Sequence, residues 1–441
     1  MRTLHITGGQ PLRGSIRLGG AKNASYKLMI AALLADNESR LLNFSRIADV
    51  TTVAEIITAL GGRAVTTGER SMVIDPRQLQ SSTLSPDSGQ QGRFSSMFIP
   101  VLLAKFGKAE VPLPGGDQIG ARPLDRHFAG LEALGARITQ SNTGILAQTD
   151  GLVGATYRFE KNSHTGTETL LMAAVLAKGT TILENAAEEP EVNDLIAFLN
   201  AMGAQITRNG RTIVIIGVPS LRGAIHKIMP DRNEAVSYAC AALVTKGDII
   251  IENATPTHLE AFLKKVEEIG GGYEVGEYGI RFYYKGPLKS TTVATQIHPG
   301  FMTDWQPLFT TVLTQCEGES ILHETIMENR FQHVDNLREM GANIEPFQPE
   351  VENPENTYNF NLADDTSGMP HAIRISGPTK LRAISTQARD LRQGATILIA
   401  ALAAEGTTIL TNITHIDRGY EELPERLISL GASIKIEDIN S

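Results

Sequence analysis

The amino-acid sequence predicts an α/β protein of two similar domains, each built from three repeats, with the sheets outside and one helix of every repeat inside. Three observations support this prediction. A phrase of secondary-structure signals recurs along the chain, a glycine occupies the same place in each copy, and several helix-like runs have no polar face.

The recurring phrase is an apolar helix-like run, a Gly-Thr-Thr-like turn, a short strand, a loop, an amphipathic helix and then Leu-Gly-Ala before another strand. Its clearest copies are residues 176–207 and 402–436. The glycine after the amphipathic helix recurs about every 70 residues, at Gly61, Gly135, Gly203, Gly270, Gly341 and Gly431. Because a β-branched run follows each glycine, we expect it to end the helix in the left-handed conformation.

The helix that opens each repeat has a different pattern. Residues 26–35, 169–177 and 395–403 are apolar nearly all round, which is typical of a helix buried on every side. The break between the third and fourth repeats is expected at Pro230-Asp231. Residues 346–370 are rich in proline, asparagine and acidic residues, and we expect an exposed insertion there.

Composition limits the possible functions. A chain of 441 residues is too long for a single core, and 41% hydrophobic with 20% charged residues is typical of a soluble globular protein. The net charge of -9 argues against a nucleic-acid or anionic-membrane partner, because no basic excess could neutralise phosphates over a broad face. Any bound polyanion must therefore be small and met by a local cluster of cations.

The cysteines and the N-terminal residues indicate a cytoplasmic protein. Cys240 and Cys316 lie in apolar, helix-like surroundings without CxxC spacing, so we expect buried free thiols. The N-terminus lacks the apolar core of a signal peptide, and no apolar run approaches the length of a membrane span. No His/Cys/Asp cluster has ligand spacing, so the sequence indicates neither a metal nor an organic cofactor.

Residues 111–127 (VPLPGGDQIGARPLDRH) carry the first candidate for chemistry. Pro-Gly-Gly at 114–116 predicts a mobile loop. Asp117 follows, and Arg122 precedes a proline at the expected first turn of a helix. This pattern suits a lid near 112–123 that closes on an anionic substrate and carries a proton. A surface salt bridge beside a flexible loop is the alternative.

The repeats place more charges at equivalent positions. The loop before the amphipathic helix carries Arg122, Arg330 and Arg418, at 13, 11 and 13 residues before the helix-ending glycine. The starts of the buried helices carry Lys22, Arg93, Asp304 and Arg392. Since helix N-termini favour anions, cations at these places predict a phosphate or carboxylate site where they converge. Surface or interdomain salt bridges are the alternative for any one of them.

The chain resembles the enolpyruvyl transferase family over nearly its whole length. The motifs that carry the resemblance are GGAKN (19–23), GARPLDRH (120–127), ENAAEEPEV (184–192), HPGFMTDWQ (298–306), ENRFQHV (328–334), ARDLR (388–392) and HIDRGYE (415–421). The resemblance implies two inside-out α/β barrel domains built from six βαβαββ-like repeats. Domain one would span 22–230, and domain two would span 1–21 and 231–441.

The resemblance also implies a reaction. Phosphoenolpyruvate would give its enolpyruvyl group to the 3′-hydroxyl of UDP-N-acetylglucosamine and release phosphate, the first committed step of peptidoglycan synthesis. Other acceptors stay open, such as a different nucleotide sugar or shikimate 3-phosphate, as does a non-catalytic paralogue that binds a nucleotide sugar. Enzymes acting on shikimate 3-phosphate typically have serine in place of Asn23 and lack RPLD and HIDRGYE in this form.

The resemblance assigns roles position by position. It makes Asp117 the proton donor and lets Asp304 act on the sugar hydroxyl. The remaining catalytic positions are Lys22, Arg392 and Arg418. The implied phosphoenolpyruvate-binding residues are Lys22, Asn23, Arg93, Arg122, Arg330, Arg392 and Arg418. The implied UDP-sugar-binding residues are Asn23, Arg93, Arg122, Pro123, Leu124, Asp125, Lys161, Ser163, Asp304 and Ile326.

Two departures from the family pattern stand out. Most members carry cysteine at the position of Asp117. A thiol has a pKa of about 8.5 and a carboxyl about 3.9, so burial must raise the pKa of Asp117 if it is to hold a proton near neutrality. His164 and Thr165 replace a small apolar pair, and Arg126 takes a normally apolar place, which leaves the exact acceptor sugar open.

Overall fold

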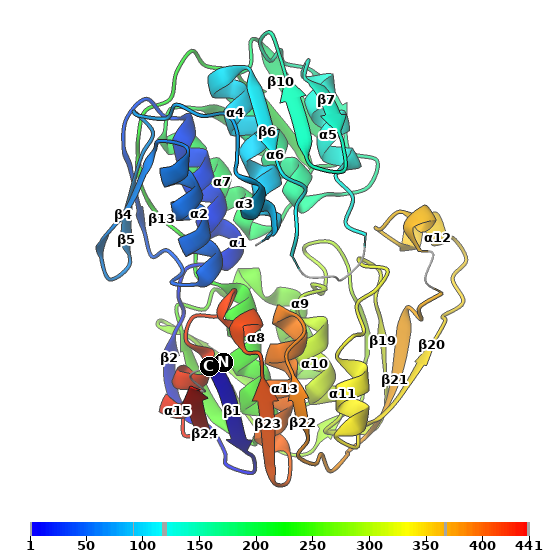
Figure 1. Ribbon diagram of the computed structural model, residues 1–441. Helices are drawn as coiled ribbons and strands as arrows, with labels where there is room; N and C mark the ends of the chain where they lie inside the picture. Colours follow the sequence, from blue (N-terminus) through cyan, green and yellow to red (C-terminus); the bar gives the residue numbers. More distant parts are fainter. Residues whose placement is uncertain (1, 91, 117–120, 366–367, 439–441) are drawn as a thin grey trace. The chain divides into compact units, whose positions relative to one another are not determined.

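The computed structural model of the protein describes residues 2–90, 92–116, 121–365 and 368–438 (Figure 1). The chain divides into two compact units. The first unit comprises Gly19–Asp117 and Pro123–Met229. The second unit comprises Met1–Leu18, Gln118–Arg122 and Pro230–Ser441. Each unit has its own hydrophobic core, so each meets the physical criterion of a domain.

Within the described ranges the strands form six sheets, three in each unit, and they repeat one topology. The first strand of a repeat runs parallel to the second, which pairs antiparallel with the fourth, and the third lies at the edge. In the second repeat the first strand is reduced to a parallel bridge between Thr83 and Glu110. The predicted α/β fold of two domains built from six repeats is therefore confirmed.

The first unit holds eleven of the described strands: β3 (Ser39–Leu42), β4 (Arg63–Gly68), β5 (Ser71–Asp75), β6 (Lys108–Val111), β7 (Arg137–Gln140), β8 (Ile145–Gln148), β9 (Thr156–Arg158), β10 (Thr180–Glu184), β11 (Gln205–Asn209), β12 (Thr212–Ile216) and β13 (Ile225–Lys227). The last of these, β13, pairs with β3 and supplies the first strand of the first repeat. The unit is thus closed by its own final strand.

The second unit holds the other described strands: β1 (Arg2–Thr7), β2 (Arg13–Arg17), β14 (Asp248–Glu252), β15 (Gly272–Gly276), β16 (Gly279–Tyr283), β17 (Leu288–Lys289), β18 (Thr292–Ala294), β19 (Cys316–His323), β20 (Asn343–Phe347), β21 (Ala372–Gly377), β22 (Ser385–Gln387), β23 (Thr407–Thr411) and β24 (Ser433–Asp438). The N-terminal strands complete two of its sheets. β2 runs parallel to β14, and β1 lies between β23 and β24, with Leu4 opposite Leu410 and Ile436.

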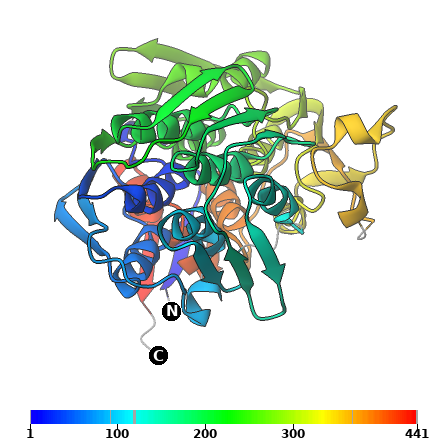
Figure 2. The same cartoon turned by 90° about the horizontal axis from the view of Figure 1, so that it is seen from above.

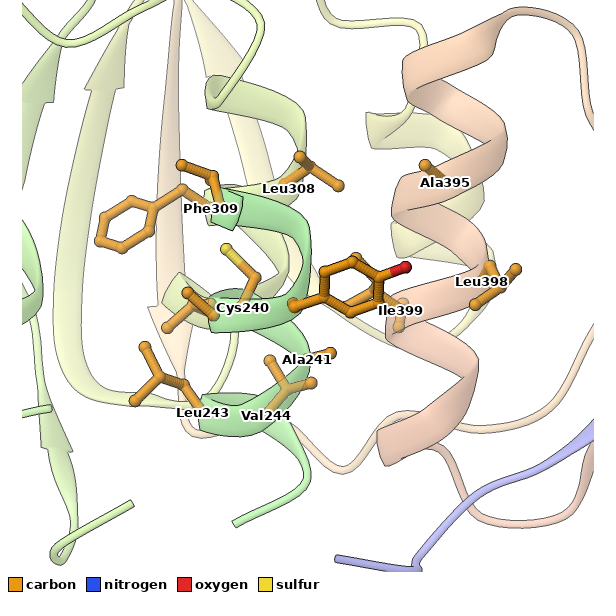
Figure 3. Close-up of a cluster of buried hydrophobic side chains, with 14 of the residues drawn as sticks. Cys240, Ala241, Leu243, Val244, Leu308, Phe309, Ala395, Leu398 and Ile399 are labelled. Atoms are coloured by element: carbon orange, nitrogen blue, oxygen red, sulfur yellow. The ribbon is translucent and has the colours of Figure 1, made fainter. Parts of the chain in front are cut away.

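One helix of each repeat is buried. These inner helices are α1 (Lys22–Ala31), α4 (Phe98–Phe106), α6 (His164–Ala174), α8 (Arg232–Val244), α10 (Gln306–Leu313) and α13 (Leu391–Ala403). All residues of α8 are buried, and it packs against α10 and α13. Figure 3 shows this packing, with Cys240, Leu308 and Ile399 contributed by the three helices. The apolar runs in the sequence predict these helices because no face of them meets water.

The remaining helices lie outside the inner set. The amphipathic ones are α2 (Ala48–Ala59), α5 (Asp125–Ala133), α7 (Pro190–Ala201), α9 (Glu260–Glu268), α11 (Val334–Glu339) and α15 (Leu423–Ser429). The short ones are η1 (Ala32–Leu34), α3 (Pro86–Gln90), η2 (Arg93–Met97), η3 (Pro256–His258), α12 (Pro354–Thr357), η4 (Leu362–Asp364) and α14 (Thr414–Asp417). The six helix-ending glycines have φ between 77° and 106°, which confirms the predicted left-handed conformation.

Two predictions about the ends of elements need correction. Helix α5 begins at Asp125 rather than at Arg122, because Arg122 has φ 48° and precedes a proline, both of which oppose a helical start. Cys316 begins strand β19 instead of lying in a helix, although both cysteines are free and buried as predicted.

The insertion at 346–370 is only partly exposed. Its helix α12 lies at the margin of the second unit in both Figure 1 and Figure 2. Tyr358 and Phe360, which follow α12, are buried, and their stacked rings have centres 4.9 Å apart. His371 packs against both rings, and His323 contacts Tyr358. The polar composition of the insertion did not indicate that its aromatic side chains are buried. These rings attach the insertion to the second unit.

Candidate functional site

In the second unit, an aspartate lies between two buried arginines. Asp304 precedes α10, and its side chain is 22% exposed. Arg330 Nη2 donates to one carboxylate oxygen at 2.8 Å, and Arg392 Nη2 donates to the other at 2.9 Å. The side chains of Arg330 and Arg392 are only 3% and 6% exposed. The structure therefore brings three of the predicted site residues into direct contact.

Arg392 is held from three sides. The N-terminus of α13 fixes its backbone, because the Asp390 side chain caps the helix and accepts the Arg392 backbone N–H at 2.8 Å. Arg392 Nη1 donates to the hydroxyl of Tyr420 at 2.8 Å, and that hydroxyl lies 2.8 Å from Ser237 Oγ on α8. The sequence reasoning missed Tyr420, although it belongs to the HIDRGYE motif. The guanidinium thus has little freedom to turn away from Asp304.

The electrostatics keep Asp304 ionised. Burial alone would raise the pKa of Asp304, but the charges of Arg392 and Arg330, with a smaller contribution from Arg122, lower it well below its usual range. Burial would lower the pKa of Arg392, and the charge of Asp304 outweighs that effect. Asp304 is therefore held as a carboxylate that accepts hydrogen bonds, and it is a weak base while both arginines contact it.

The other two predicted arginines of this unit lie on loops. Arg122 is half-buried, and the N–H of the preceding residue, Ala121, donates to the carboxylate of Glu328. Arg418 follows α14 and donates its backbone N–H to Thr414 at 3.2 Å. Ile326 follows β19 and donates its backbone N–H to Glu324 at 2.8 Å. Glu328 is a further residue that the sequence reasoning did not assign.

In the first unit, Lys22 is the first residue of α1. Its ammonium contacts Asp49 Oδ2 at 2.5 Å and lies 5.6 Å from the centre of the Tyr26 ring. Asp49 is buried in the first turn of α2. Asn23 follows Lys22 and is half-buried. The sequence located the cation, but its acidic and aromatic neighbours became visible only in the structure.

The predicted UDP-sugar residues of the first unit cluster at two helix starts. Leu124 is the N-cap position of α5, and Asp125 is its first residue. Ser163 caps α6, its Oγ accepting the N–H of Gly166 at 3.1 Å, and Lys161 lies two residues before it. Pro123 is exposed and precedes α5. These placements present backbone N–H groups and polar side chains at positive dipole ends, where anions are favoured.

A histidine joins these two helices. His127 on α5 lies 2.8 Å from Thr165 Oγ1 on α6, counting from its Nε2 atom. Burial, reinforced by the positive charge of Arg93, lowers the pKa of His127 to about 4. The imidazole is therefore neutral at pH 7. The charge of Arg93, the first residue of η2, therefore acts on the histidine of the α5–α6 contact.

The sequence also missed a sealed charge cluster in this unit. Lys27 Nζ forms an ion pair with Glu168, whose other oxygen lies 3.3 Å from His164 Nε2. The side chains of Lys27 and Glu168 are 2% and 0% exposed. Burial would raise the pKa of Glu168, but His164 and Lys27 lower it. The unusual His164 was the one signal in the sequence that pointed to this cluster.

Three further predictions concern the proton donor, metal binding and membrane spans. Asp117 lies outside the described residues. Across the parts of the chain that the structure describes, no group of three or more His, Cys, Asp or Glu side chains is arranged to hold a metal ion. Among the same residues, none of the helices has both the length and the apolar character that crossing a bilayer requires.

Comparison with known proteins adds to this geometry. A family model described as EPSP synthase (3-phosphoshikimate 1-carboxyvinyltransferase) matches residues 6–427. The chain is 41% identical over 439 residues to the UDP-N-acetylglucosamine 1-carboxyvinyltransferase of Acidobacterium capsulatum, covering 98% of this chain and 95% of that protein. It is 40% identical over 437 residues to the enzyme of the same name from Idiomarina loihiensis, covering 99% of each.

Solved structures support the fold. The enolpyruvyl transferase NikO from Streptomyces tendae is similar with a TM-score of 0.84 and 23% identity, covering 99% of both chains. EPSP synthase from Acinetobacter baumannii is similar with a TM-score of 0.72 and 17% identity, covering 99% of this chain and 100% of that one.

Proposed function

The chain belongs to the EPSP synthase family of enolpyruvyl transferases, and from this premise we propose that it is an enzyme that transfers the enolpyruvyl group of phosphoenolpyruvate to UDP-N-acetylglucosamine. The acceptor atom is the 3′-hydroxyl, and phosphate is released. Identity of about 40% over nearly the whole chain to relatives named for this acceptor favours it over shikimate 3-phosphate.

The observation that carries the proposal is the placement of Asp304 between Arg330 and Arg392. Two guanidinium groups on one partly exposed carboxylate form a site in which a substrate carboxylate can take the place of the side chain. When phosphoenolpyruvate takes over these hydrogen bonds, Asp304 loses part of its positive surroundings. The pKa of Asp304 then rises, and the carboxylate becomes a better base.

The chemistry requires one acid and one base. Asp117 protonates C3 of phosphoenolpyruvate, which makes C2 electrophilic, and Asp304 accepts the proton of the sugar hydroxyl as its oxygen bonds to C2. The tetrahedral intermediate then breaks its bond from C2 to the phosphate oxygen, and C3 returns a proton to Asp117 as the double bond forms again. The proton on Asp304 leaves with the released phosphate, which restores both carboxyl groups. Fixed cations stabilise the phosphate and carboxylate charges while this happens.

The other predicted residues bind the two substrates. Lys22, Arg122 and Arg418 bind the phosphate, and Arg330 and Arg392 bind the carboxylate of phosphoenolpyruvate, with Arg93 nearby. The UDP-sugar is bound by Asn23, Arg122, Pro123, Leu124, Asp125, Lys161, Ser163 and Ile326. Bidentate arginine contacts suit both anions because their fork geometry matches paired oxygens.

The boundaries near residues 22 and 230 are proposed as the limits of two enolpyruvyl transferase domains. The product is proposed to enter peptidoglycan synthesis in the cytoplasm, and therefore to support cell wall formation, cell shape and division. This assignment follows from the acceptor and depends on it.

The test is phosphate release from phosphoenolpyruvate plus UDP-N-acetylglucosamine. The native protein is expected to release phosphate only with both substrates, and Asp117→Asn is expected to lower turnover by about 10²- to 10⁴-fold while leaving sugar binding intact. Phosphate release with shikimate 3-phosphate instead would reassign the acceptor. Sugar binding without any turnover by the native protein would indicate a non-catalytic paralogue.

A further inference from the structure

The segment between β19 and α11, residues 324–333, contains two acidic side chains that hold backbone N–H groups. Glu324 is buried and accepts N–H bonds from Ile326 and Met327 at 2.8 and 3.1 Å. Its carboxylate also accepts the hydroxyls of Thr295 and Thr303, each at 2.9 Å. Glu324 therefore fixes the shape of its own turn.

Glu328 is used differently. Its side chain is buried, yet it accepts the backbone N–H of Ala121, which is exposed and lies 207 positions earlier in the chain. Both residues belong to the second unit. A buried carboxylate that is bound to the main chain of a distant loop fixes where that loop lies, since an unpaired buried charge is costly.

The residue held next to this bond is Arg122. Its φ of 48° lies in the left-handed region, which side-chain-bearing residues avoid, and the following proline restricts it further. Such a conformation persists only where surrounding contacts hold it. The bond from Ala121 to Glu328 is one such contact, and it acts on the peptide that leads directly into Arg122.

The same segment also contributes Arg330, which contacts Asp304. Arg330 follows Glu328 by two residues and donates to Asp304 at 2.8 Å. The charge of Arg122 acts on Asp304 as well and helps to keep its pKa low. Glu328 thus binds the backbone next to Arg122, and Arg330, two residues later, is itself the second cation near Asp304.

We infer that Glu328 is a positioning residue that fixes the Ala121–Arg122 peptide so that the Arg122 guanidinium is presented to the substrate anions next to Asp304. In this role Glu328 acts through Arg122 and is not a catalytic residue. The inference rests on the proposed function, in which Arg122 binds the phosphate of phosphoenolpyruvate.

The first test is a double-mutant cycle. Glu328→Ala is expected to lower kcat/KM for phosphoenolpyruvate by about 10- to 100-fold, the size expected for losing a charge-assisted hydrogen bond. In the Arg122→Ala background the same change is expected to cost less than about 3-fold, because the cation it positions is gone. Glu328→Gln keeps an acceptor oxygen and is expected to restore most of the loss. Glu339→Ala, an exposed carboxylate on α11, is the matched control.

A second readout does not depend on catalysis. Amide hydrogen exchange of a peptide containing Ala121 is expected to speed up in Glu328→Ala and to stay slow in Glu328→Gln and Glu339→Ala. Unchanged exchange in Glu328→Ala, or equal losses of kcat/KM in the native and Arg122→Ala backgrounds, would overturn the inference. If the native protein releases no phosphate, the proposed function fails, and the exchange data alone decide whether Glu328 holds this peptide.

Discussion

Two charge clusters of this protein use similar parts but differ in their access to solvent. In the second unit Asp304 lies between Arg330 and Arg392, and its carboxylate is partly exposed. In the first unit Glu168 lies between Lys27 and His164, and its carboxylate is sealed. A partly exposed carboxylate can exchange its partners for those of a substrate, whereas a sealed one serves the fold.

The cations differ as well. The two arginines offer several donors in a fixed plane, so they can accept a substrate anion after releasing Asp304. Lys27 is a single point charge, and burial would lower its pKa if Glu168 did not raise it. Under the proposed function we assign the chemistry to the Asp304 cluster and a stabilising role to the Glu168 cluster.

The largest expected effect is on stability in the first unit. Lys27→Met removes the buried ammonium and leaves Glu168 with His164 as its remaining partner, and it is expected to lower the free energy of unfolding by about 3–5 kcal/mol. Urea denaturation followed by circular dichroism measures this change. The double substitution Lys27→Met with Glu168→Gln is expected to recover part of the loss. A loss below about 1 kcal/mol in Lys27→Met would mean that the cluster is not structural.

The next largest effect is expected in the second unit, on the activation free energy of the reaction and not on the free energy of unfolding. Arg392→Met is expected to lower kcat/KM for phosphoenolpyruvate by about 10²- to 10³-fold, as losing one preorganised donor does. Steady-state phosphate release measures it, with the exposed Arg338→Met on α11 as control. An unchanged kcat/KM together with a large loss of stability would reverse the assignment of the two clusters.

Two histidines of the first unit, His164 and His127, are expected to make stability depend on pH in opposite directions. Burial would lower the pKa of His164, but Glu168 raises it above 6.5, so its stabilisation is present below pH 6.5 and is lost as the pH rises through the folded-state pKa. The pKa of His127 is lowered to about 4, so its contribution is lost as the pH falls from 6.5 towards 4.

Unfolding free energies measured from pH 4 to 9 test both contributions. His164→Gln is expected to remove the decline on the alkaline side and leave the acid side unchanged. His127→Gln is expected to flatten the acid side only. An alkaline decline that survives in His164→Gln would exclude His164 as its source.

The last prediction is that one treatment leaves the activity unchanged. Cysteine-directed inhibitors such as fosfomycin are not expected to inactivate the protein over time, because position 117 is aspartate. The two native thiols are buried, and burial raises the pKa of Cys316 to about 12 and that of Cys240 further, so neither forms a thiolate readily. Asp117→Cys should create sensitivity. Time-dependent inactivation of the native protein with an adduct at residue 117 would show that the motif alignment is wrong.

Sequence reasoning located the charged residues better than their partners. It placed Lys22, Arg93, Asp304 and Arg392 at the starts of buried helices. The structure has Lys22, Asp304 and Arg392 at or within two residues of those starts. Arg93 instead begins η2, which precedes the buried helix α4. It did not find Asp49, Tyr420, Glu328 or the pair of Lys27 with Glu168. Tyr420 and Glu328 lie in motifs that the sequence shows, but the contacts of all these residues follow from packing between repeats.

The sequence by itself determined the repeat, its buried helices, the left-handed glycines and the family, since each depends on local periodicity or on motifs read in order. The tertiary structure decided which charges meet and which of them water can reach. Asp304 finds its partners 26 and 88 positions away. Pairing over such separations, and the different exposure of the Asp304 and Glu168 carboxylates, are set by how the repeats pack around their inner helices.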